Sequence, residues 1–168
     1  MSSADAARLF DEHHASLFRY LLRLTGDADV AHDAAQETFT RYVQKPPRNE
    51  HPRAWLFTVA TNIVRAASLQ RQRRATLLAG GAGRATVADP LPDPEQATLA
   101  SERRNAVRLA LDSLPERERT VLLMREEGFT HREIAAAVQT TTGSVGTMIA
   151  RALDKLAAAL PIDLQETP

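Results

Sequence analysis

The sequence predicts an all-α protein built from two small helical domains joined by a flexible linker. Apolar residues recur at helical spacing along both ends of the chain, and no useful length alternates with the period of a β-strand. The composition is 43% apolar but only 5% aromatic, which is typical of helical bundles built from Leu, Ala and Val. Between the two ends, LLAGGAGRATVADPLPDPEQ combines clustered glycines with spaced prolines, a composition that favours a linker over a core.

The composition also excludes several classes of protein. The 168 residues suffice for one ordinary domain or two small ones, and the absence of cysteine excludes disulfides and thiolate metal sites. The polar, acidic start MSSADAARLFDEHH is unlike a signal peptide, and no apolar run approaches the ~20 residues of a membrane span. We therefore expect a cytoplasmic protein without membrane insertion. A formal net charge of zero argues against indiscriminate coating of nucleic acid.

The first domain is predicted over residues 1–74 and opens with a helix over about 4–25 that stops at Gly26. The predicted apolar face of this helix is broad and comprises Leu9, Phe10, Leu17, Phe18, Leu21, Leu22 and Leu24. Asp27 or Asp29 is expected to cap a second helix, because an aspartate can accept hydrogen bonds from free amides at a helix start. The inward residues of that helix are predicted to be Val30, Ala31, Ala34, Phe39, Tyr42 and Val43.

Pro46-Pro47 is expected to end the second helix, and a third starts near Pro52, since proline is favoured in a first helical turn. The third helix runs to a cluster of arginines, and its expected inward residues are Trp55, Leu56, Val59, Ile63 and Val64. Residues 75–98 then form the predicted linker.

The second domain, residues 99–168, is expected to hold helices at roughly 95–112, 116–127, 131–138 and 142–159. Leu114-Pro115 separates the first two, and Gly128 supplies a left-handed stop after the second. These boundaries leave the last two helices separated by a short turn.

Residues 130–156 carry the helix-capping residues typical of a helix-turn-helix. Thr130 and Glu133 form a capping box, and Thr142 or Ser144 can cap the helix that follows the turn. That second helix is expected to bury Val145, Ile149, Ala152, Leu153 and Leu156. A helix-turn-helix lays its second helix in the DNA major groove, although an ordinary pair of packed helices remains the alternative.

Four motifs follow one another along the chain. LFRYLLRLTGDADVAHDAAQETFTRYV carries an Ala-x-Asp-x-x-Gln-Glu-x-Phe pattern from Ala31 to Phe39, and RAWLFTVATNIVRAASLQRQRR joins Trp55-Leu56 to a basic end. LDSLPERERTVLLMREEGFTHREIA and SVGTMIARAL follow after the linker. In this order, and over nearly the whole chain apart from the linker, they resemble bacterial RNA polymerase sigma factors of the extracytoplasmic-function (ECF) group.

The resemblance implies a promoter-specificity subunit rather than an enzyme, with no cofactor. Residues 1–74 would be a sigma region 2-like domain that binds polymerase core and melts promoter DNA, and residues 99–168 a region 4-like domain that reads the upstream element. The implied partners are RNA polymerase core, promoter DNA as duplex upstream element and melted strand, and an anti-sigma protein.

The candidate polymerase-binding residues are Asp33, Gln36 and Glu37, which share one polar turn of the second helix. A carboxylate and amide cluster suits docking to a basic surface, which the resemblance identifies as the clamp coiled coil of the largest polymerase subunit. On the residues alone, a solvated helix face is the simpler interpretation.

Promoter opening requires groups that capture unstacked bases and hold a displaced strand. The third helix and its basic end supply such groups, namely Asn62, Arg65, Arg71, Arg73 and Arg74. Trp55 could stack on a base, but a core position is equally consistent with its spacing.

In the second domain, the candidate phosphate contacts are Arg117, Arg119, Arg132 and Arg151, and the candidate base readers are Thr142, Ser144, Thr147 and Arg151. The chain departs from the family pattern at Gly146, Met148 and Ala150, where larger or basic residues are usual, and at Gln139 in a turn position commonly held by Gly. These departures predict recognition of the upstream element that is weak, altered or dependent on partners.

Two alternatives come from other classes. A ligand-responsive or dimeric helix-turn-helix regulator would bind duplex DNA alone, whereas a sigma factor should be monomeric and need polymerase core. A helical enzyme using His32, Asp33 and Glu37 lacks a nucleophile, base and orienting group in any recognisable set. His13-His14 and His32 are too few for a metal site, so no metal is assigned.

Overall fold

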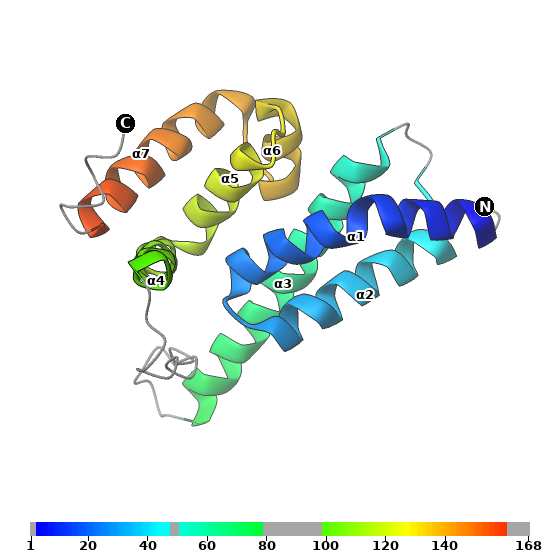
Figure 1. Ribbon diagram of the computed structural model, residues 1–168, viewed down its shortest axis with the longest axis horizontal. Helices are drawn as coiled ribbons and strands as arrows, with labels where there is room; N and C mark the ends of the chain where they lie inside the picture. Colours follow the sequence, from blue (N-terminus) through cyan, green and yellow to red (C-terminus); the bar gives the residue numbers. More distant parts are fainter. Residues whose placement is uncertain (1–2, 48–50, 79–98, 161–168) are drawn as a thin grey trace. The chain divides into compact units, whose positions relative to one another are not determined.

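The computed structural model describes residues 3–47, 51–78 and 99–160, and within these ranges it contains seven helices and no strand (Figure 1). The all-α prediction is confirmed. The chain divides into two compact units, residues 1–89 and 90–168. The third helix continues to Leu78, past the expected start of the linker at residue 75. The rest of the predicted linker, residues 79–98, lies outside the described residues.

The first unit begins with a helical hairpin of α1 (Ser3–Thr25) and α2 (Ala28–Gln44). Gly26 makes the turn possible because its φ of 71° lies in the left-handed region. Asp27 is the N-cap of α2, and its Oδ1 accepts hydrogen bonds from the backbone N–H groups of Asp29 at 2.9 Å and Val30 at 3.0 Å. Of the two predicted caps, Asp27 is therefore the one used.

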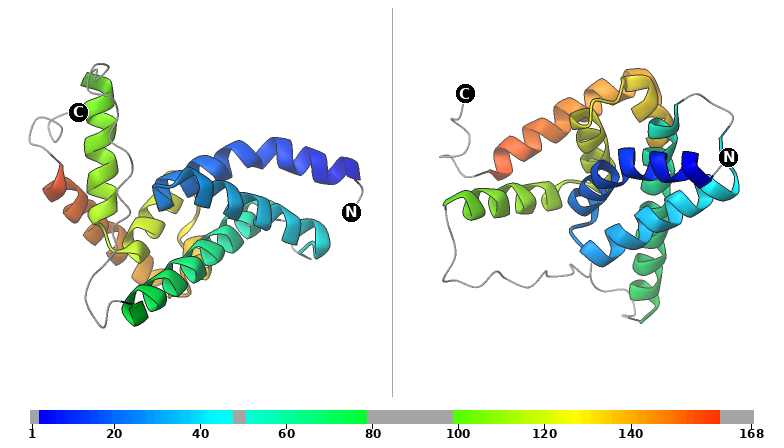
Figure 2. Two further views of the ribbon diagram at one scale, coloured as in Figure 1. Left: turned by 90° about the horizontal axis from the view of Figure 1, so that it is seen from below. Right: turned by 45° about the vertical axis from the view of Figure 1, so that its right-hand side comes forward.

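The hairpin packs on α3 (Pro52–Leu78), whose C-terminal part, green in Figure 1, projects past it (Figures 1 and 2). The core between them includes the fully buried side chains of Leu17, Leu21, Leu56 and Phe57. Of the residues predicted to face inward from α3, Leu56 and Val64 are buried while Trp55, Val59 and Ile63 are half-buried. The ring of Trp55 meets that of Tyr42 edge-on, with centroids 5.3 Å apart, so this tryptophan belongs to the packing of α2 on α3.

A polar contact missed from the sequence sits at the centre of this core. The hydroxyls of Tyr20 on α1 and Thr61 on α3, both with no exposed surface, share a hydrogen bond of 2.7 Å. Thr61 donates its own proton to the carbonyl of Phe57, so Tyr20 is the donor to Thr61. This pair satisfies both buried hydroxyls and joins the first helix of the unit to the last.

Three residues predicted to be inward in this unit are exposed instead. Phe10 is 42%, Leu22 37% and Val43 54% exposed. The expected apolar stripes were too wide, because α1 and α2 bury a narrower strip against each other and against α3 than their apolar spacing suggests. Phe10 and Val43 consequently line a groove on the surface between α1 and α2.

The second unit comprises α4 (Leu99–Ser113), α5 (Glu116–Glu126), α6 (His131–Val138) and α7 (Thr142–Ala159), close to the predicted boundaries. Residues 95–98 of the expected first helix lie outside the described residues. Gly128 follows α5 with a left-handed φ of 84°, as predicted for a residue that stops this helix. Leu114, Val121, Met124, Phe129, Ile134 and Val145 are among the buried side chains that fill the core.

The helix-turn-helix is formed by α6 and α7, and its predicted capping box is present. The backbone N–H of Glu133 donates to the Thr130 hydroxyl at 3.3 Å, while the Glu133 carboxylate accepts from the Thr130 backbone N–H at 2.8 Å. The cap of α7 was predicted wrongly. It is Thr141, not Thr142 or Ser144, because its hydroxyl accepts from the Ser144 backbone N–H.

The face that α7 buries is also narrower than predicted. Val145 and Ala152 are buried and Ile149 and Leu156 are half-buried, whereas Leu153 is 49% exposed, contrary to the prediction. No helix in the described part of the chain is long and apolar enough to cross a membrane.

Candidate nucleic-acid and polymerase interfaces

The three candidate polymerase-binding residues lie together on the solvent side of α2. Asp33, Gln36 and Glu37 are all exposed, and at about 100° per residue their spacing places them on one face of the helix. Glu37 also accepts a 2.7 Å hydrogen bond from Nε of Arg41, one turn further along. Because this pair is exposed, it steadies the side chains without contributing much stability. The surface offers two carboxylates and an amide in a small area.

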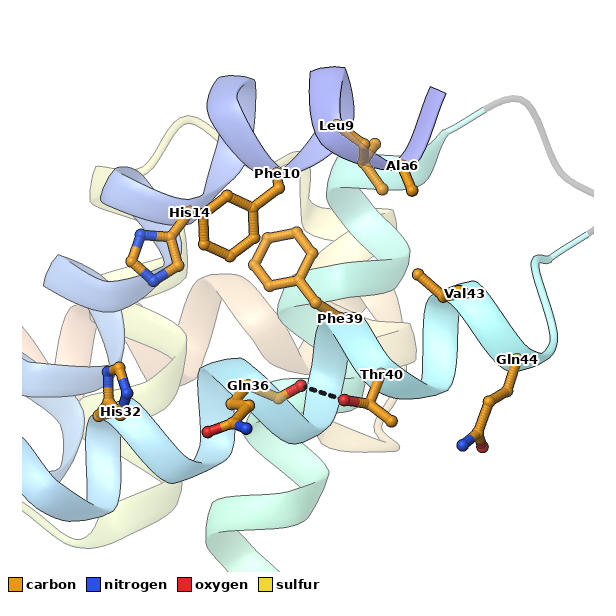
Figure 3. Close-up of a pocket in the computed structure, with 10 residues that line it drawn as sticks. All are labelled: Ala6, Leu9, Phe10, His14, His32, Gln36, Phe39, Thr40, Val43 and Gln44. Atoms are coloured by element: carbon orange, nitrogen blue, oxygen red, sulfur yellow. Dashed lines mark hydrogen bonds between the residues drawn. The ribbon is translucent and has the colours of Figure 1, made fainter. Parts of the chain in front are cut away.

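A groove runs beside this polar face, between α1 and α2 (Figure 3). Its volume is about 650 Å³, and no Asp, Glu, Lys or Arg lines it within the described ranges. The lining residues are Ala6, Leu9, Phe10, His14, His32, Gln36, Phe39, Thr40, Val43 and Gln44. Gln36 belongs to both surfaces, so the polar face of α2 and the apolar groove are continuous.

Of the two histidines that line this groove, His14 takes part in aromatic packing, while His32 is exposed. The ring of His14 stacks on that of Phe10 with centroids 4.3 Å apart and lies 6.3 Å from that of Phe18. The ring of Phe39 meets Phe10 at 5.0 Å. The part of the chain that the structure describes contains no group of three or more His, Cys, Asp or Glu side chains placed to hold a metal ion.

The candidate strand-melting residues of α3 do not share one face. At about 100° per residue, Asn62, Arg65 and Arg73 fall within about 80° of one another around the helix axis. Arg71 falls about 180° from Asn62, with Arg74 between them. All are exposed except Arg65, which is half-buried. The structure therefore groups Asn62, Arg65 and Arg73, while Arg71 and Arg74 lie on other sides of the projecting end of α3.

Two candidate phosphate contacts on α5 are engaged inside the unit. Arg119 forms an ion pair with Asp112, Nη1 to Oδ1 3.0 Å, and its Nη2 donates to the carbonyl of Asp112 at 3.2 Å. Its side chain is only 15% exposed, so the geometry favours a role in fixing the corner between α4 and α5 over contact with DNA. Arg117 donates from Nη2 to the carbonyls of Val138 at 2.9 Å and Gln139 at 3.0 Å, at the end of α6.

The remaining candidates lie on the exposed side of the helix-turn-helix. Arg132, Thr142, Thr147 and Arg151 are exposed, whereas Ser144 is half-buried and its hydroxyl shares a 2.7 Å hydrogen bond with that of Thr141. The exposed side of α7 also carries Gly143 and Ala150, so its surface is shallow.

One further side chain at this surface was not singled out from the sequence. His131, exposed at the start of α6, has its Cε1 3.9 Å from where a Cβ on Gly146 would lie. A side chain at position 146 would touch the imidazole in ordinary van der Waals contact. Its neighbour Gly146 could have drawn attention to His131, but only if the crossing of α6 and α7 had been known.

The family model for sigma-70 region 2 matches residues 9–74, and that for sigma-70 region 4 matches residues 104–156. The ECF RNA polymerase sigma factor EcfG of Rhodopseudomonas palustris is 32% identical over 153 residues, 88% of this chain and 81% of the relative. The chain belongs to the ECF sigma factor family. The RNA polymerase sigma-H factor of Pseudomonas aeruginosa is 30% identical to this ECF sigma factor, over 95% of the chain and 90% of the relative.

A stronger but shorter similarity links the sigma factor to SigL of Mycobacterium tuberculosis, an ECF RNA polymerase sigma factor. The two are 50% identical over 70 residues, a segment that spans 38% of this chain and 40% of the relative's length. Among solved structures, the sigma factor RpoE of Bartonella quintana, in complex with the anti-sigma factor NepR, matches with a TM-score of 0.75. That match covers 95% of this chain and 98% of the other at 21% identity, which shows a shared fold.

Proposed function

We propose that this ECF sigma factor binds RNA polymerase core and directs it to promoters to initiate transcription, without catalysing a reaction itself. The observation that carries the proposal is the presence, on one chain, of two folded units that each match a sigma-70 region and each present an exposed polar helix face. Polymerase supplies the nucleotide chemistry, and no cofactor is needed. The proposed place of action is the cytoplasm, where polymerase core is found.

Core binding is assigned to the α2 face formed by Asp33, Gln36 and Glu37. Two carboxylates close together attract a basic partner surface, and electrostatic complementarity of this kind speeds and orients docking. The adjoining groove carries no charged lining residue and can accept apolar side chains of the same partner. The proposed first domain, residues 1–74, thereby couples polymerase to the DNA-binding surface of α3.

Promoter melting is assigned to α3. Asn62 can hydrogen-bond the edge of an unstacked base, and Arg65 and Arg73 on the same side can hold the backbone or stack on bases. Arg71 and Arg74, on the other sides of the projecting helix, suit phosphates of the neighbouring DNA. Residues 75–98 are the proposed linker to the second domain.

Reading of the upstream element is assigned to the second domain, residues 99–168. α7 would lie in the major groove with Thr142, Ser144, Thr147 and Arg151 towards base edges, and Arg132 towards a phosphate. The small side chains of Gly143, Gly146 and Ala150 give few contacts, so the affinity of this domain alone is expected to be low. Binding would then depend on tethering to polymerase, which raises the effective concentration of the domain at the promoter.

An anti-sigma protein is the third proposed partner. The structurally similar Bartonella quintana sigma factor is solved in complex with the anti-sigma factor NepR. By extension, a protein that covers the α2 face or α7 of this chain would keep it from polymerase and promoter.

The proposed function is tested by mixing the purified chain with bacterial polymerase core and separating the products by size. We expect the free chain to be a monomer, to comigrate with core at equal stoichiometry, and to bind promoter DNA tightly only in that complex. A chain that dimerises, ignores core and binds duplex DNA by itself would contradict the proposal and support a conventional regulator.

A further inference from the structure

Arg117 links α5 to the turn of the helix-turn-helix. One nitrogen of its guanidinium, Nη2, donates to two consecutive carbonyls, those of Val138 at 2.9 Å and Gln139 at 3.0 Å. The last carbonyls of a helix have no partner within the helix, and they carry the negative end of its dipole. A positively charged donor that meets both is therefore well matched to the end of α6.

Gln139 has an unusual backbone conformation at this point. Its φ of 54° and ψ of 58° lie in the left-handed region, and it is the only residue other than glycine with a positive φ among the described residues. A side chain disfavours this conformation, which glycine adopts freely. Some other contact must hold the backbone here, and the bond from Arg117 falls on the carbonyl of Gln139 itself.

The turn sets the direction of α7, the recognition helix of the helix-turn-helix. Between the end of α6 at Val138 and the start of α7 at Thr142 the chain has few residues, so the dihedral angles at Gln139 decide how α7 leaves α6. The Thr140 N–H donates back to the carbonyl of Ala135 at 2.9 Å, a bond that forms only when Gln139 is left-handed. The turn therefore has one arrangement supported by contacts at both ends.

We propose that Arg117 is a positioning residue for the recognition helix, and not a phosphate contact: it holds the left-handed turn at Gln139 and so fixes α7 in the orientation that reads duplex DNA. The inference rests on the proposed function, because it takes α7 to be the DNA-reading helix. It assigns to the α5 arginine an effect on DNA binding that passes through the protein backbone, with no contact between Arg117 and DNA.

The two roles differ in their dependence on salt. A lost phosphate contact lowers the steepness of log K against log salt by about one unit, because one fewer counterion is released on binding. A lost positioning contact reduces the fraction of molecules with α7 correctly oriented, which weakens binding at every salt concentration by the same factor. Salt titration thus separates them in a way that affinity at one salt concentration does not.

The test uses holoenzyme made from polymerase core and the full chain, with a duplex selected by the wild-type holoenzyme from a random-sequence pool. Arg117→Ala should weaken binding by about tenfold, as expected if the competent fraction falls to about one tenth, with an unchanged salt slope. The matched control is Arg132→Ala, which removes the same charge from an exposed site on α6 and should make the slope shallower by about one unit.

A second variant tests whether Arg117 acts through the backbone at Gln139. It also shows whether a loss of affinity in Arg117→Ala comes from unfolding. Gln139→Gly accepts the left-handed conformation without support, so the double variant Arg117→Ala with Gln139→Gly should recover most of the lost affinity. A glycine in the turn cannot replace a missing phosphate contact. Amide exchange should agree: the Thr140 N–H should exchange faster in Arg117→Ala and return towards the wild-type rate in the double variant.

Three results would overturn the inference: a shallower salt slope in Arg117→Ala, an affinity equal to wild type in that variant, or no recovery on adding Gln139→Gly. A fourth result would test the proposed function on which the inference rests, namely DNA binding by α7. If Arg132→Ala and Arg151→Ala both leave holoenzyme binding and its salt slope unchanged, α7 does not face DNA, and the proposed function of this helix fails together with the inference.

Discussion

Glu118 on α5 and Lys155 on α7 are joined by a two-pronged ion pair, with Nζ of the lysine 2.9 Å from Oε1 and 2.7 Å from Oε2 of the carboxylate. Glu118 belongs to the charged run Glu116-Arg117-Glu118-Arg119 of α5, and three residues of this run contact other helices. Arg117 reaches the end of α6, Glu118 reaches α7, and Arg119 reaches the end of α4. The charged run ties one helix to three others.

The first prediction follows from this pair. Glu118→Gln and Lys155→Met should each destabilise the chain, with a coupling of about 1 kcal/mol in a double-mutant cycle, since Glu118 is 15% and Lys155 50% exposed at the side chain. Urea unfolding measures the cycle, and the coupling should shrink at high salt. The exposed pair of Arg41 and Glu37 on α2 is the control and should show a smaller coupling. Equal couplings for both pairs would show that partial burial of Glu118 adds nothing.

The second prediction concerns Phe39, which borders the groove in the first unit. The side chain is only 8% exposed and its ring packs against that of Phe10, so Phe39→Ala should destabilise the chain by about 3 kcal/mol, at the lower end for buried aromatics. Val43→Ala, one turn along α2 and 54% exposed, should cost less than about 0.5 kcal/mol. Thermal or urea unfolding compares the two. A similar loss in both variants would mean that the groove is closed in solution.

The third prediction concerns promoter opening by α3. Asn62→Ala with Arg73→Ala, two residues on the same side of α3, should leave binding to polymerase core intact while slowing open-complex formation on a duplex promoter. A template with a pre-melted bubble should rescue much of this defect, because the cost of unstacking the bases has been removed. Permanganate footprinting of both templates gives the comparison.

The control for that experiment is Arg71→Ala, which removes a charge on the opposite side of the helix from Asn62. It should weaken opening less than Arg73→Ala does. Equal loss on duplex and bubble templates would instead point to a defect in folding or docking, and would count against the assignment of α3.

The fourth prediction uses the small side chains of the recognition helix. Gly146→Arg should stabilise α7 by up to about 1 kcal/mol, because glycine is a poor helix former. The substitution also has room, since the nearest atom to a new Cβ is Cε1 of His131 at 3.9 Å. If the arginine reaches a phosphate, binding of the full chain in holoenzyme to duplex should tighten, with a salt slope steeper by about one unit. Stabilisation with no change in affinity or slope would mean that position 146 faces away from DNA.

Much of the fold could be predicted from local signals. Gly26, Asp27, Pro52, Gly128 and the capping box at Thr130 mark helix ends by the conformations and hydrogen bonds of the residues themselves, so the boundaries were close. Burial was harder. Helical spacing identifies an apolar face but not how wide a strip the neighbours cover, and for this reason Phe10, Leu22, Val43 and Leu153 were wrongly expected inside.

The candidate site residues likewise fall into those that could be predicted from one helix and those that depend on contacts between helices. Asp33, Gln36 and Glu37 could be grouped from spacing on one helix, and the structure leaves all of them exposed together. Arg117 and Arg119 could not be assigned from the sequence, because their partners are backbone carbonyls and a carboxylate brought near by the folding of other helices. A charge on a DNA-binding domain suggests a phosphate until the tertiary contacts are known.

The most direct test of the central claim is run-off transcription with polymerase core and either the wild-type chain or the variant Asp33→Arg with Glu37→Arg. We expect wild type to give promoter-dependent transcripts, and the variant to give none and to fail to bind core, with helicity and melting temperature near normal. The control is Asp11→Arg with Glu12→Arg, the same charge change on exposed residues of α1, which should behave as wild type. Undiminished core binding and transcription by the Asp33 and Glu37 variant would contradict the claim that this face of α2 docks to polymerase.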